Sequence, residues 1–143
     1  AGVELKPKKP ETLAEEARLE RLRGVIAAAV DYYHACLIEA SDEGARYARY
    51  YAREKRGLND ETLRAFKIGL APLGWTNAVD ALRGLGYADD DLLAAGIAGR
   101  SEKSGRLYDL FRGRLMIPIR DERGRAVGFG GRALDPEEKA KYI

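Results

Sequence analysis

The segment 112–134, RGRLMIPIRDERGRAVGFGGRAL, constrains the fold of this chain more than any other. Two apolar runs flank the sequence DERG, in which aspartate and glycine favour a tight turn. Hydrophobic residues alternate along both runs, as they do in strands that bury one face. The residues expected on that buried face are Leu115, Ile117, Ile119, Val127 and Phe129. The segment therefore predicts an antiparallel hairpin near the C-terminal end of the chain.

The opposite face of this hairpin is predicted to carry cations and glycines. Its members are Arg114, Arg120, Gly128, Gly130 and Arg132. Glycine removes side-chain bulk where another backbone must come close, and the arginine guanidinium is a forked donor that matches phosphate. Such a face could hold a polynucleotide. The alternative is that the arginines are solvated and the glycines mark a bulge or a twist.

Charge is unevenly distributed along the chain. Of its 143 residues, 25 are Lys or Arg and 23 are Asp or Glu, which gives a formal net charge of +2. Residues 100–143 nevertheless carry eleven cations against seven anions. This local excess favours an anionic partner such as nucleic acid. A chain of this length is expected to form about one domain.

Cys36 is the only cysteine, so the sequence contains neither a disulfide framework nor a thiolate cluster for zinc. No run reaches the ~18 consecutive apolar residues that a membrane-spanning helix requires. The polar start AGVELKPKKP does not resemble a signal peptide. These features predict a protein of the reducing cytoplasm that has no membrane partner.

The apolar pattern predicts an α+β fold. Residues 11–40 are expected to be helical, with Thr12 and Glu15 as a capping box and Gly24 as a point that can divide the helix. Shorter helices are expected over residues 42–56, 60–66 (capped by Asn59), 77–86 (capped by Thr76) and 88–96, and a strand over residues 67–72. The prediction is N-terminal helices, then several short helices and a small mixed or antiparallel sheet that ends in the hairpin.

A second basic group lies on the predicted helix 42–56. Arg46, Arg49, Arg53 and Arg56 are three or four residues apart, so an α-helix would place them on one stripe. The aromatic residues beside this stripe are Tyr47, Tyr50 and Tyr51. Rings among arginines suit stacking on unpaired bases, but core tyrosines beside a solvated arginine face are the structural alternative. We expect Tyr50 and Tyr51 in the core and leave a binding role open for Arg56.

The sequence holds no recognisable catalytic constellation. His34 is the only histidine and lies in an apolar helical run, where a satisfied ring is expected rather than a base. The consecutive acids Asp89, Asp90 and Asp91 would point to different sides of a helix start, so helix capping explains them better than metal binding. We therefore expect no catalytic residue, no metal site and no cofactor in these residues.

Several motifs follow one another along the chain. They are KRGLNDETLRAFKIGLAPLGW, LLAAGI, RLYDLFRGRLMIPIRDERGRAVGFGGRAL and KYI. Together they closely resemble the bacterial DnaG-type DNA primase family. The resemblance extends over residues 46–143 in continuous order, which makes it far more specific than a single glycine pattern. It implies the N-terminal subdomain of that family's RNA polymerase core for residues 11–143 and an interdomain linker for residues 1–10.

The resemblance also implies which side chains contact nucleic acid. The candidates that match family motifs are Arg56 in RGL, Arg132 in GGR, Lys141 in KYI, and, as further motif positions, Arg114 and Trp75. Trp75 could instead serve the core, and Arg120 is an additional candidate from the hairpin pattern. The chain departs from the family at Leu110, where arginine is common, and at Ala140, where proline is common.

For the whole protein, the resemblance implies a DNA-directed RNA polymerase that synthesises short RNA primers on single-stranded DNA during replication. A zinc-binding module would precede these residues, and a Toprim subdomain with the catalytic acids and Mg²⁺ would follow them. The implied partners are the DNA template, the RNA–DNA duplex, nucleoside triphosphates and, through other parts, the replicative helicase at the bacterial nucleoid. The chain alone is expected to be inactive. The alternative is a noncatalytic module for nucleic-acid or protein binding that shares this subdomain.

Overall fold

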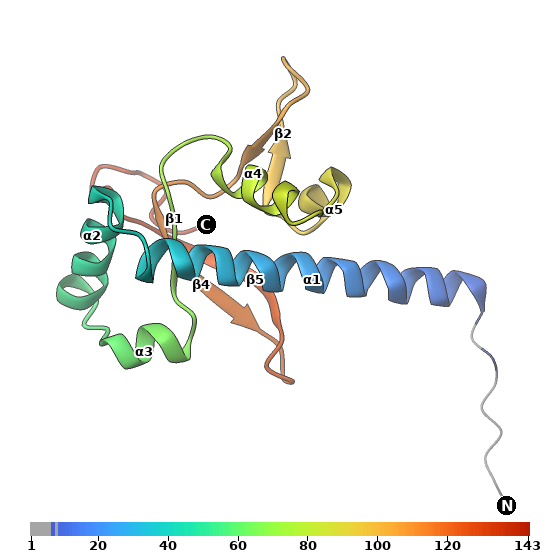
Figure 1. Cartoon of the computed structure of the whole chain (residues 1–143), viewed down its shortest axis with the longest axis horizontal. Helices are drawn as coiled ribbons and strands as arrows, with labels where there is room; N and C mark the ends of the chain where they lie inside the picture. The colour runs from blue at the N-terminus through green and yellow to red at the C-terminus, as the bar shows by residue number, and fades with distance from the viewer. Residues whose placement is uncertain (1–6, 8) are drawn as a thin grey trace, which may run out of the picture.

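The computed structural model describes residues 7 and 9–143 as an α+β fold (Figure 1). The helices are α1 (Pro10–Ile38), α2 (Glu43–Tyr50), α3 (Asp60–Ala65), α4 (Asn77–Gly84) and α5 (Asp89–Ala94), with the π-helical turn η1 (Tyr51–Lys55) directly after α2. The strands are β1 (Gly69–Ala71), β2 (Ala98–Arg100), β3 (Leu107–Asp109), β4 (Arg114–Arg120) and β5 (Ala126–Ala133). The predicted fold class is confirmed.

Helix α1 is a single helix, so the predicted division at Gly24 is wrong. It begins at Pro10, whose fixed φ suits the first helical turn, and Thr12 lies inside the helix instead of capping it. Beyond Gly24 the helix packs a buried stripe against the body. This packing outweighs the ~1 kcal/mol that a glycine costs in a helix interior.

The N-terminal part of α1 extends away from the rest of the fold. Residues 11–20 are exposed, and Figure 1 shows this end of the helix projecting from the body. Residues 1–6 and 8, which make up most of the predicted linker 1–10, lie outside the described residues. Among the residues that the structure describes, no helix combines the length and the apolar character needed to cross a bilayer.

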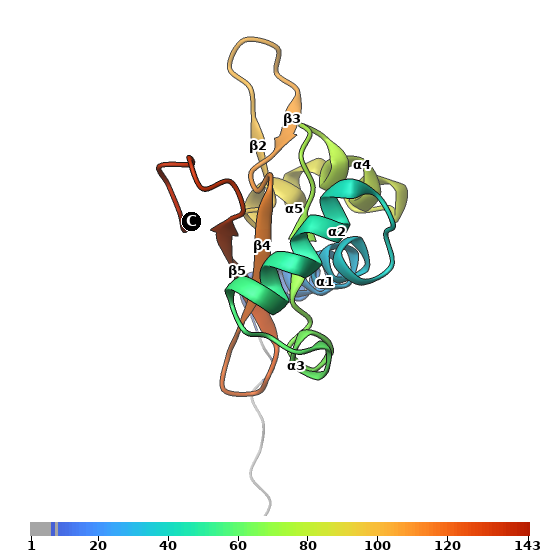
Figure 2. The ribbon, with the colours of Figure 1, turned by 90° about the vertical axis from the view of Figure 1, so that its left-hand side faces the viewer.

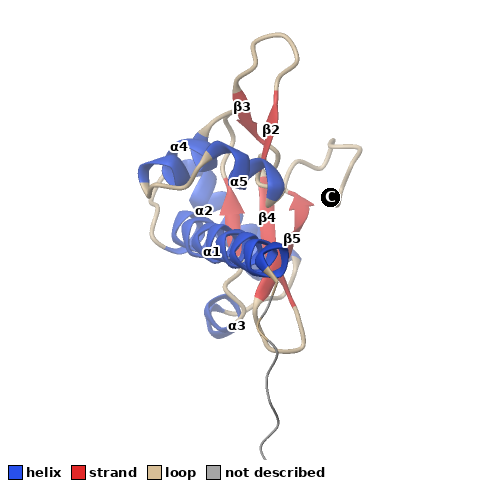
Figure 3. Cartoon of the chain, turned by 90° about the vertical axis from the view of Figure 1, so that its right-hand side faces the viewer, coloured by secondary structure: helices blue, strands red, loops and turns tan. Residues whose placement is uncertain are grey.

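Strands β1, β4 and β5 form an antiparallel sheet with β4 in the centre (Figure 2). Helix α1 crosses one face of this sheet, as the view along the helix shows (Figure 3). The approach is closest at Gly69 of β1, where an added Cβ would lie 2.6 Å from Tyr33 of α1. Glycine is therefore required at this crossing. Phe129 of β5 points to the same face, and its ring meets Tyr33 edge-on with 5.3 Å between centroids.

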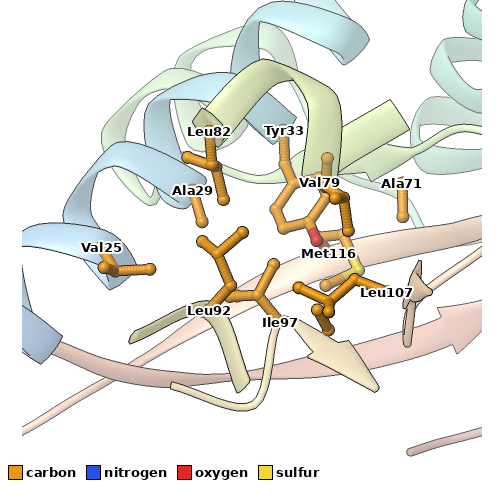
Figure 4. Packing of buried hydrophobic residues seen from close by; sticks show 12 residues of the cluster. Val25, Ala29, Tyr33, Ala71, Val79, Leu82, Leu92, Ile97, Leu107 and Met116 are labelled. Carbon is orange, nitrogen blue, oxygen red and sulfur yellow. The ribbon is translucent and has the colours of Figure 1, made fainter. Parts of the chain in front are cut away.

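Two hydrophobic clusters lie on the two faces of this sheet. The first joins α1, α4, α5 and the sheet through Val25, Ala29, Tyr33, Leu82, Leu92 and Met116 (Figure 4). In the second, Leu70 and Leu115 pack with Ala48 of α2, Ala52 of η1 and Leu63 of α3. Alternating side chains of β1 and β4 serve the two clusters, because neighbouring residues of a strand point to opposite faces. The root of the hairpin is therefore covered on both faces.

The hairpin β4–β5 forms as predicted, but the predicted composition of its faces is wrong. The cross-strand pairs on one face are Leu115 with Arg132, Ile117 with Gly130 and Ile119 with Gly128. Phe129 instead lies opposite Pro118, on the α1 face, and Val127 has no partner where the register shifts. Ile119 and Val127 are about half exposed, at 52% and 48%. Alternation within each strand does not fix the register between strands, which the turn and this bulge set.

The structure contains a second, smaller hairpin that was not predicted from the sequence. Strands β2 and β3 pair in antiparallel fashion, with Ala98 opposite Asp109 and Arg100 opposite Leu107. Their connection projects from the body beyond the end of the main sheet (Figure 2). Strands of three residues joined by the polar sequence SEKSGR give too short a pattern to indicate strands.

The other two predicted helix caps, Asn59 and Thr76, have different outcomes. Asn59 caps α3, because its side-chain oxygen accepts a hydrogen bond from the Thr62 amide at 2.8 Å. Thr76 occupies the capping position of α4, but its hydroxyl donates to Asp80 at 3.1 Å instead of accepting from the helix amides. The strand predicted over residues 67–72 is observed as β1.

Candidate nucleic-acid interface

Three of the side chains predicted to bind nucleic acid meet in one hollow. A cavity of about 340 Å³ is lined by Arg56, Arg132 and Lys141, which come from the end of η1, from β5 and from the C-terminal segment. Lys55 adds a fourth cation, and Asp135 is the only acid among the described residues that line it. We call this hollow the basic pocket. Four cations against one carboxylate make an attractive site for a phosphate group.

The π-helical turn η1 determines where Arg56 lies. The Arg56 amide donates to the Tyr51 carbonyl, five residues back, at 3.2 Å. Residues five apart lie close to one another on the surface of such a wide turn, so Arg56 and Tyr51 line the same pocket. In an α-helix these two positions would point about 140° apart. The predicted arginine stripe assumed α-helical spacing, which ends at Tyr50.

Arg132 is held at the pocket by two aromatic rings. Its Nε donates to the Tyr51 hydroxyl at 3.0 Å, and its guanidinium carbon lies 4.6 Å from the centroid of the Tyr142 ring. The hydrogen bond with Tyr51 raises the pKa of Arg132, so the side chain stays a cation. No further hydrogen bond within the described part of the chain engages its terminal nitrogens. These are the donors with which a guanidinium grips a phosphate.

Lys141 reaches the pocket because the C-terminal segment pairs with β5. The Ala133 amide donates to the Lys141 carbonyl at 2.7 Å, and Gly131 and Ile143 exchange two backbone hydrogen bonds at 2.8 and 3.1 Å. The Lys141 ammonium donates to the Pro136 carbonyl across the intervening loop. A few backbone hydrogen bonds thus bring a residue of the C-terminal segment beside Arg132.

Arg114 lies behind the basic pocket. It is only 6% exposed, and its guanidinium donates to the carbonyls of Gly131 at 3.3 Å and Lys141 at 3.2 Å. These contacts tie the C-terminal segment to β5 and so hold Lys141 in place. Arg114 therefore supports the basic pocket, because its guanidinium binds the backbone carbonyls that hold Lys141 in place.

Arg120 lies at the other end of β4, away from the basic pocket. Its guanidinium donates to the Gly124 carbonyl at 3.0 Å and closes over the turn of the hairpin. Because the register places Arg120 opposite Ala126, it shares neither the pocket nor the strand face of Arg132. The prediction that Arg114, Arg120 and Arg132 share one face of the hairpin is wrong.

Trp75 belongs to a second group of aromatic and cationic side chains. It is 64% exposed, so it is not a core residue. The Arg112 guanidinium carbon lies 4.1 Å from the centroid of the Trp75 ring. The Tyr108 and Trp75 rings meet in an edge-to-face arrangement, with 6.2 Å between their centroids. We call these three residues the Trp75 stack. An exposed ring beside a guanidinium is typical of surfaces on which unpaired bases stack.

A cleft of about 690 Å³ adjoins the Trp75 stack. Its lining contains Trp75 together with Arg100, Lys103 and Arg106 of the β2–β3 hairpin, and Glu102 is its one acid among the described residues. The sequence analysis missed these cations because it missed the hairpin. Arg112 was missed as well, since no local pattern shows that the segment after β3 folds back onto Trp75.

Three arginines of the predicted stripe bind the protein itself. Arg46 donates to the Ser41 carbonyl at 2.9 Å, Arg49 to the carbonyls of Leu37 and Ala40 at 2.8 and 2.7 Å, and Arg53 pairs with Asp60 at 2.7 Å. Within the described residues Arg56 has no hydrogen bond or ion pair through its side chain. Tyr50 is 49% exposed, so its predicted core position is wrong. The half-buried Tyr51 packs against the second hydrophobic cluster, in line with its predicted position, and also lines the basic pocket.

His34 and the aspartates of residues 89–91, which were considered as catalytic or metal-binding side chains, contact other parts of the fold. His34 Nδ1 lies 2.7 Å from the Ile68 carbonyl, which agrees with the satisfied ring that we expected. The aspartates of residues 89–91 occupy the first turn of α5, where Asp89 pairs with Arg83 at 2.8 Å. In the part of the chain that the structure describes, no group of three or more His, Cys, Asp or Glu side chains could hold a metal ion.

Comparison with known proteins assigns this chain to a family. A family model described as the N-terminal domain of the DNA primase catalytic core matches residues 32–143. The chain belongs to this family. The DNA primase of Deinococcus radiodurans is 41% identical over 143 residues, which is all of this chain and 23% of that protein. The DNA primase of Escherichia coli K12 is 46% identical over 99 residues, which is 69% of this chain and 16% of that protein. The chain thus spans less than a quarter of these relatives.

Solved structures of the same family have a similar fold. A DnaG primase catalytic domain bound to single-stranded DNA aligns with a TM-score of 0.78 and 38% identity, over 90% of this chain and 39% of that one. The RNA polymerase domain of Mycobacterium tuberculosis DnaG, in complex with double-stranded DNA that has a 6-nucleotide overhang, also aligns with a TM-score of 0.78. It is 35% identical, over 87% of this chain and 37% of that one.

Proposed function

We propose that this chain is the nucleic-acid-binding N-terminal part of a DNA primase RNA polymerase core. Its basic pocket would hold phosphates of the template strand or of the RNA–DNA duplex. The observation that carries the proposal is that Arg56, Arg132 and Lys141 converge in one hollow from three segments of the chain. Cations repel one another, so their convergence is favourable when an anion lies among them. Two similar structures that contain DNA support this assignment.

The open strand face beside the pocket would give a nucleic acid room to approach. Gly128 and Gly130 lie on the same face of β5 as Arg132, and an added Cβ at either glycine would meet no atom within 4 Å. Ile117 and Ile119 lie opposite these glycines and are partly exposed. The face is therefore shallow and mostly apolar along the strand, with its cation at the pocket end. A sugar–phosphate backbone could lie along it and place a phosphate at Arg132.

The Trp75 stack would supply a second contact for a single strand. Stacking on an exposed indole is tolerant of sequence, and the neighbouring Arg112 and the cations of the β2–β3 hairpin can neutralise the flanking phosphates. This combination suits a template strand that must slide, because neither contact reads a base edge.

The whole protein would synthesise short RNA primers on single-stranded DNA from nucleoside triphosphates in the bacterial cytoplasm. This proposal rests on the named relatives, of which the chain spans less than a quarter. Zinc and Mg²⁺ do not fit the residues described here, which offer no cluster of metal donors. Their sites, the Toprim acids and the helicase contact would belong to other parts of the protein. On this basis the 143-residue chain alone would make no primer, and a radiolabelled nucleotide assay that detects dinucleotide synthesis would contradict this.

Salt titration of DNA binding tests the function proposed for this chain. Binding of a fluorescent single-stranded oligonucleotide is measured by anisotropy between low and moderate salt. If Arg56, Arg132 and Lys141 each neutralise one phosphate, the logarithm of affinity should fall with the logarithm of salt concentration with a slope of roughly −2, because each single-strand contact contributes about −0.7. Removing one of them, as in Lys141→Ala, should make the slope shallower by about 0.7. Absent or salt-independent binding would favour the alternative, a protein-interaction module.

A further inference from the structure

Asp109 supplies the cap of helix α4 from a distant part of the chain. Its side chain is buried, at 1% exposed, at the end of β3. Its two carboxylate oxygens accept hydrogen bonds from the amides of Ala78 at 3.0 Å and Val79 at 2.9 Å. These amides belong to the first turn of α4, where no intrahelical acceptor exists. The carboxylate therefore does what the predicted cap, Thr76, does not do.

The backbone of Asp109 holds both members of the Trp75–Arg112 pair. Its amide donates to the Trp75 carbonyl at 2.6 Å, and its own carbonyl accepts a hydrogen bond from the Arg112 guanidinium. The side chain and the backbone of this residue thus reach the start of α4, the tryptophan just before it and the arginine just after β3. The Arg112 guanidinium carbon, which the hydrogen bond to the Asp109 carbonyl helps to hold, lies 4.1 Å from the centroid of the Trp75 ring.

The environment of Asp109 explains why the carboxylate is tied to this place. Burial raises the pKa of Asp109, and the hydrogen bonds from Val79 and Ala78 act in the opposite direction. No ion pair compensates its charge within the described residues, so the helix amides are its principal partners. A carboxylate at a helix N-terminus is stabilised by these amides and by the helix dipole. If β3 moved away from α4, this buried charge would lose its partners.

We propose that Asp109 is a positioning residue for nucleic-acid binding, because its carboxylate docks β3 on α4 and thereby holds Trp75 and Arg112 in the stacked arrangement that a base and its phosphate bind. The inference rests on the role proposed above for the Trp75 stack. The exposed Trp75 and the partly buried Arg112 lose side-chain freedom when they bind a ligand. A ring–guanidinium pair that is already fixed loses less side-chain freedom. The contacts of Asp109 therefore raise the affinity for DNA, although Asp109 itself does not contact DNA.

The test uses the full 143-residue chain and Asp109→Asn. Asparagine has the same shape, but its amide group presents a donor to one of the two helix amides. Trp75 is the only tryptophan, so fluorescence anisotropy and acrylamide quenching report on this ring alone. We expect Asp109→Asn to increase the mobility of Trp75 and to weaken binding of a single-stranded oligonucleotide about threefold to tenfold. The matched control is Asp80→Asn, an exposed acid on α4 that contacts Thr76, which should leave both measurements unchanged.

A double-mutant cycle separates positioning from general destabilisation. In a Trp75→Ala background, Asp109→Asn should cause no further loss of affinity, since its effect acts through the ring. If Asp109→Asn folds poorly, Thr76→Asp in the same chain restores a cap within α4, and the weakened binding should persist because the tie to β3 is still absent. Wild-type affinity in Asp109→Asn, or an equal loss in both backgrounds, overturns the inference. Wild-type affinity in Trp75→Ala overturns the proposed role of the stack itself and the inference with it.

Discussion

The two ends of the β4–β5 hairpin carry similar numbers of arginines and use them differently. At the turn, Arg120 donates to the Gly124 carbonyl and Arg125 pairs with Asp121 at 3.0 Å. At the root, Arg114 is buried against backbone carbonyls, and Arg132 is held between Tyr51 and Tyr142 with its terminal nitrogens available. The turn thus engages Arg120 and Arg125 locally and leaves Arg123 in solvent, whereas the root holds Arg132 at a hollow.

The difference arises from what surrounds each end. At the root, α2, η1 and the C-terminal segment line one hollow with β5, so the Arg132 guanidinium is fixed by side chains from other elements and still faces that hollow. At the turn, Arg120 and Arg125 donate to a carbonyl and an acid of the turn itself, although acids of α1 line a hollow beside them. Arginine count therefore says little about binding, and the elements that converge on each arginine decide its role.

The largest effect is expected for Arg114→Ala. The substitution removes the donor to two carbonyls and truncates a buried side chain, so the free energy of unfolding should fall by about 2–4 kcal/mol. Urea denaturation followed by circular dichroism measures it. The matched control at the turn is Arg120→Ala, which should stay within about 0.5 kcal/mol of wild type. Similar losses for the two variants would remove the distinction between root and turn.

The comparison is tested most directly by Arg132→Ala against Arg123→Ala. Loss of a charge-assisted phosphate contact should weaken single-stranded DNA binding roughly tenfold or more. Arg123 lies exposed at the turn, and removing its side chain should leave affinity unchanged. Fluorescence anisotropy gives both affinities, with circular dichroism as the check on folding. Equal affinities would mean that Arg132 makes no contact with DNA.

A smaller effect is expected from the hydroxyl that orients Arg132. Tyr51→Phe keeps the ring and removes the acceptor for Arg132 Nε, so DNA affinity should fall by roughly threefold. Tyr50→Phe is the control, because Tyr50 is exposed and does not line the pocket. The same anisotropy titration distinguishes them. Wild-type affinity in Tyr51→Phe would show that the Tyr51 hydroxyl is not needed to orient the Arg132 guanidinium for DNA binding.

The smallest effect concerns the pH response of the turn. Hydrogen bonds from the Arg125 amide, then from its side chain and the Arg123 amide, lower the pKa of Asp121. A lowered pKa in the folded state stabilises the fold above the ordinary value near 3.8, and this contribution is lost as the pH falls below it. Asp121→Asn should therefore flatten the dependence of Tm on pH slightly below about pH 4, with no change in DNA affinity at neutral pH. A change in affinity would show that the turn contacts DNA.

Local sequence signals predicted correctly the features that depend on neighbouring residues. Asn59 caps the helix that follows it, and the apolar run over residues 67–72 forms β1, because each depends on a few neighbouring residues. The turn sequence DERG likewise closes the hairpin. The predictions that were wrong concern features that distant parts of the chain determine. The register of β5 depends on a bulge at Val127, and the cap of α4 comes from Asp109, about thirty residues away.

The residues of the candidate site also divide into those that the sequence identified and those for which it carried no local signal. Its three central cations were named through resemblance to a family, and the strand pattern by itself grouped Arg132 with Arg114, which the register places on the other face. Arg112 and the cations of the β2–β3 hairpin had no local signal. Their relevance depends on how the segment after β3 packs on Trp75, which is a tertiary contact.

The wide turn η1 makes the orientation of Arg56 sensitive to chain length within a single helical segment. A π turn accommodates one residue more than an α turn does, so deleting a residue between Tyr51 and Lys55 would convert it to ordinary helix at little cost in hydrogen bonds. Every side chain after the deletion would then change its angular phase relative to α2. Substitutions in η1 that spare Tyr51, Ala52 and Lys55 leave this phase unchanged, whereas an insertion or deletion there would reorient Arg56 and leave the composition of the helix almost the same. The pocket therefore depends on the length of this turn as well as on the identity of the residues that line it.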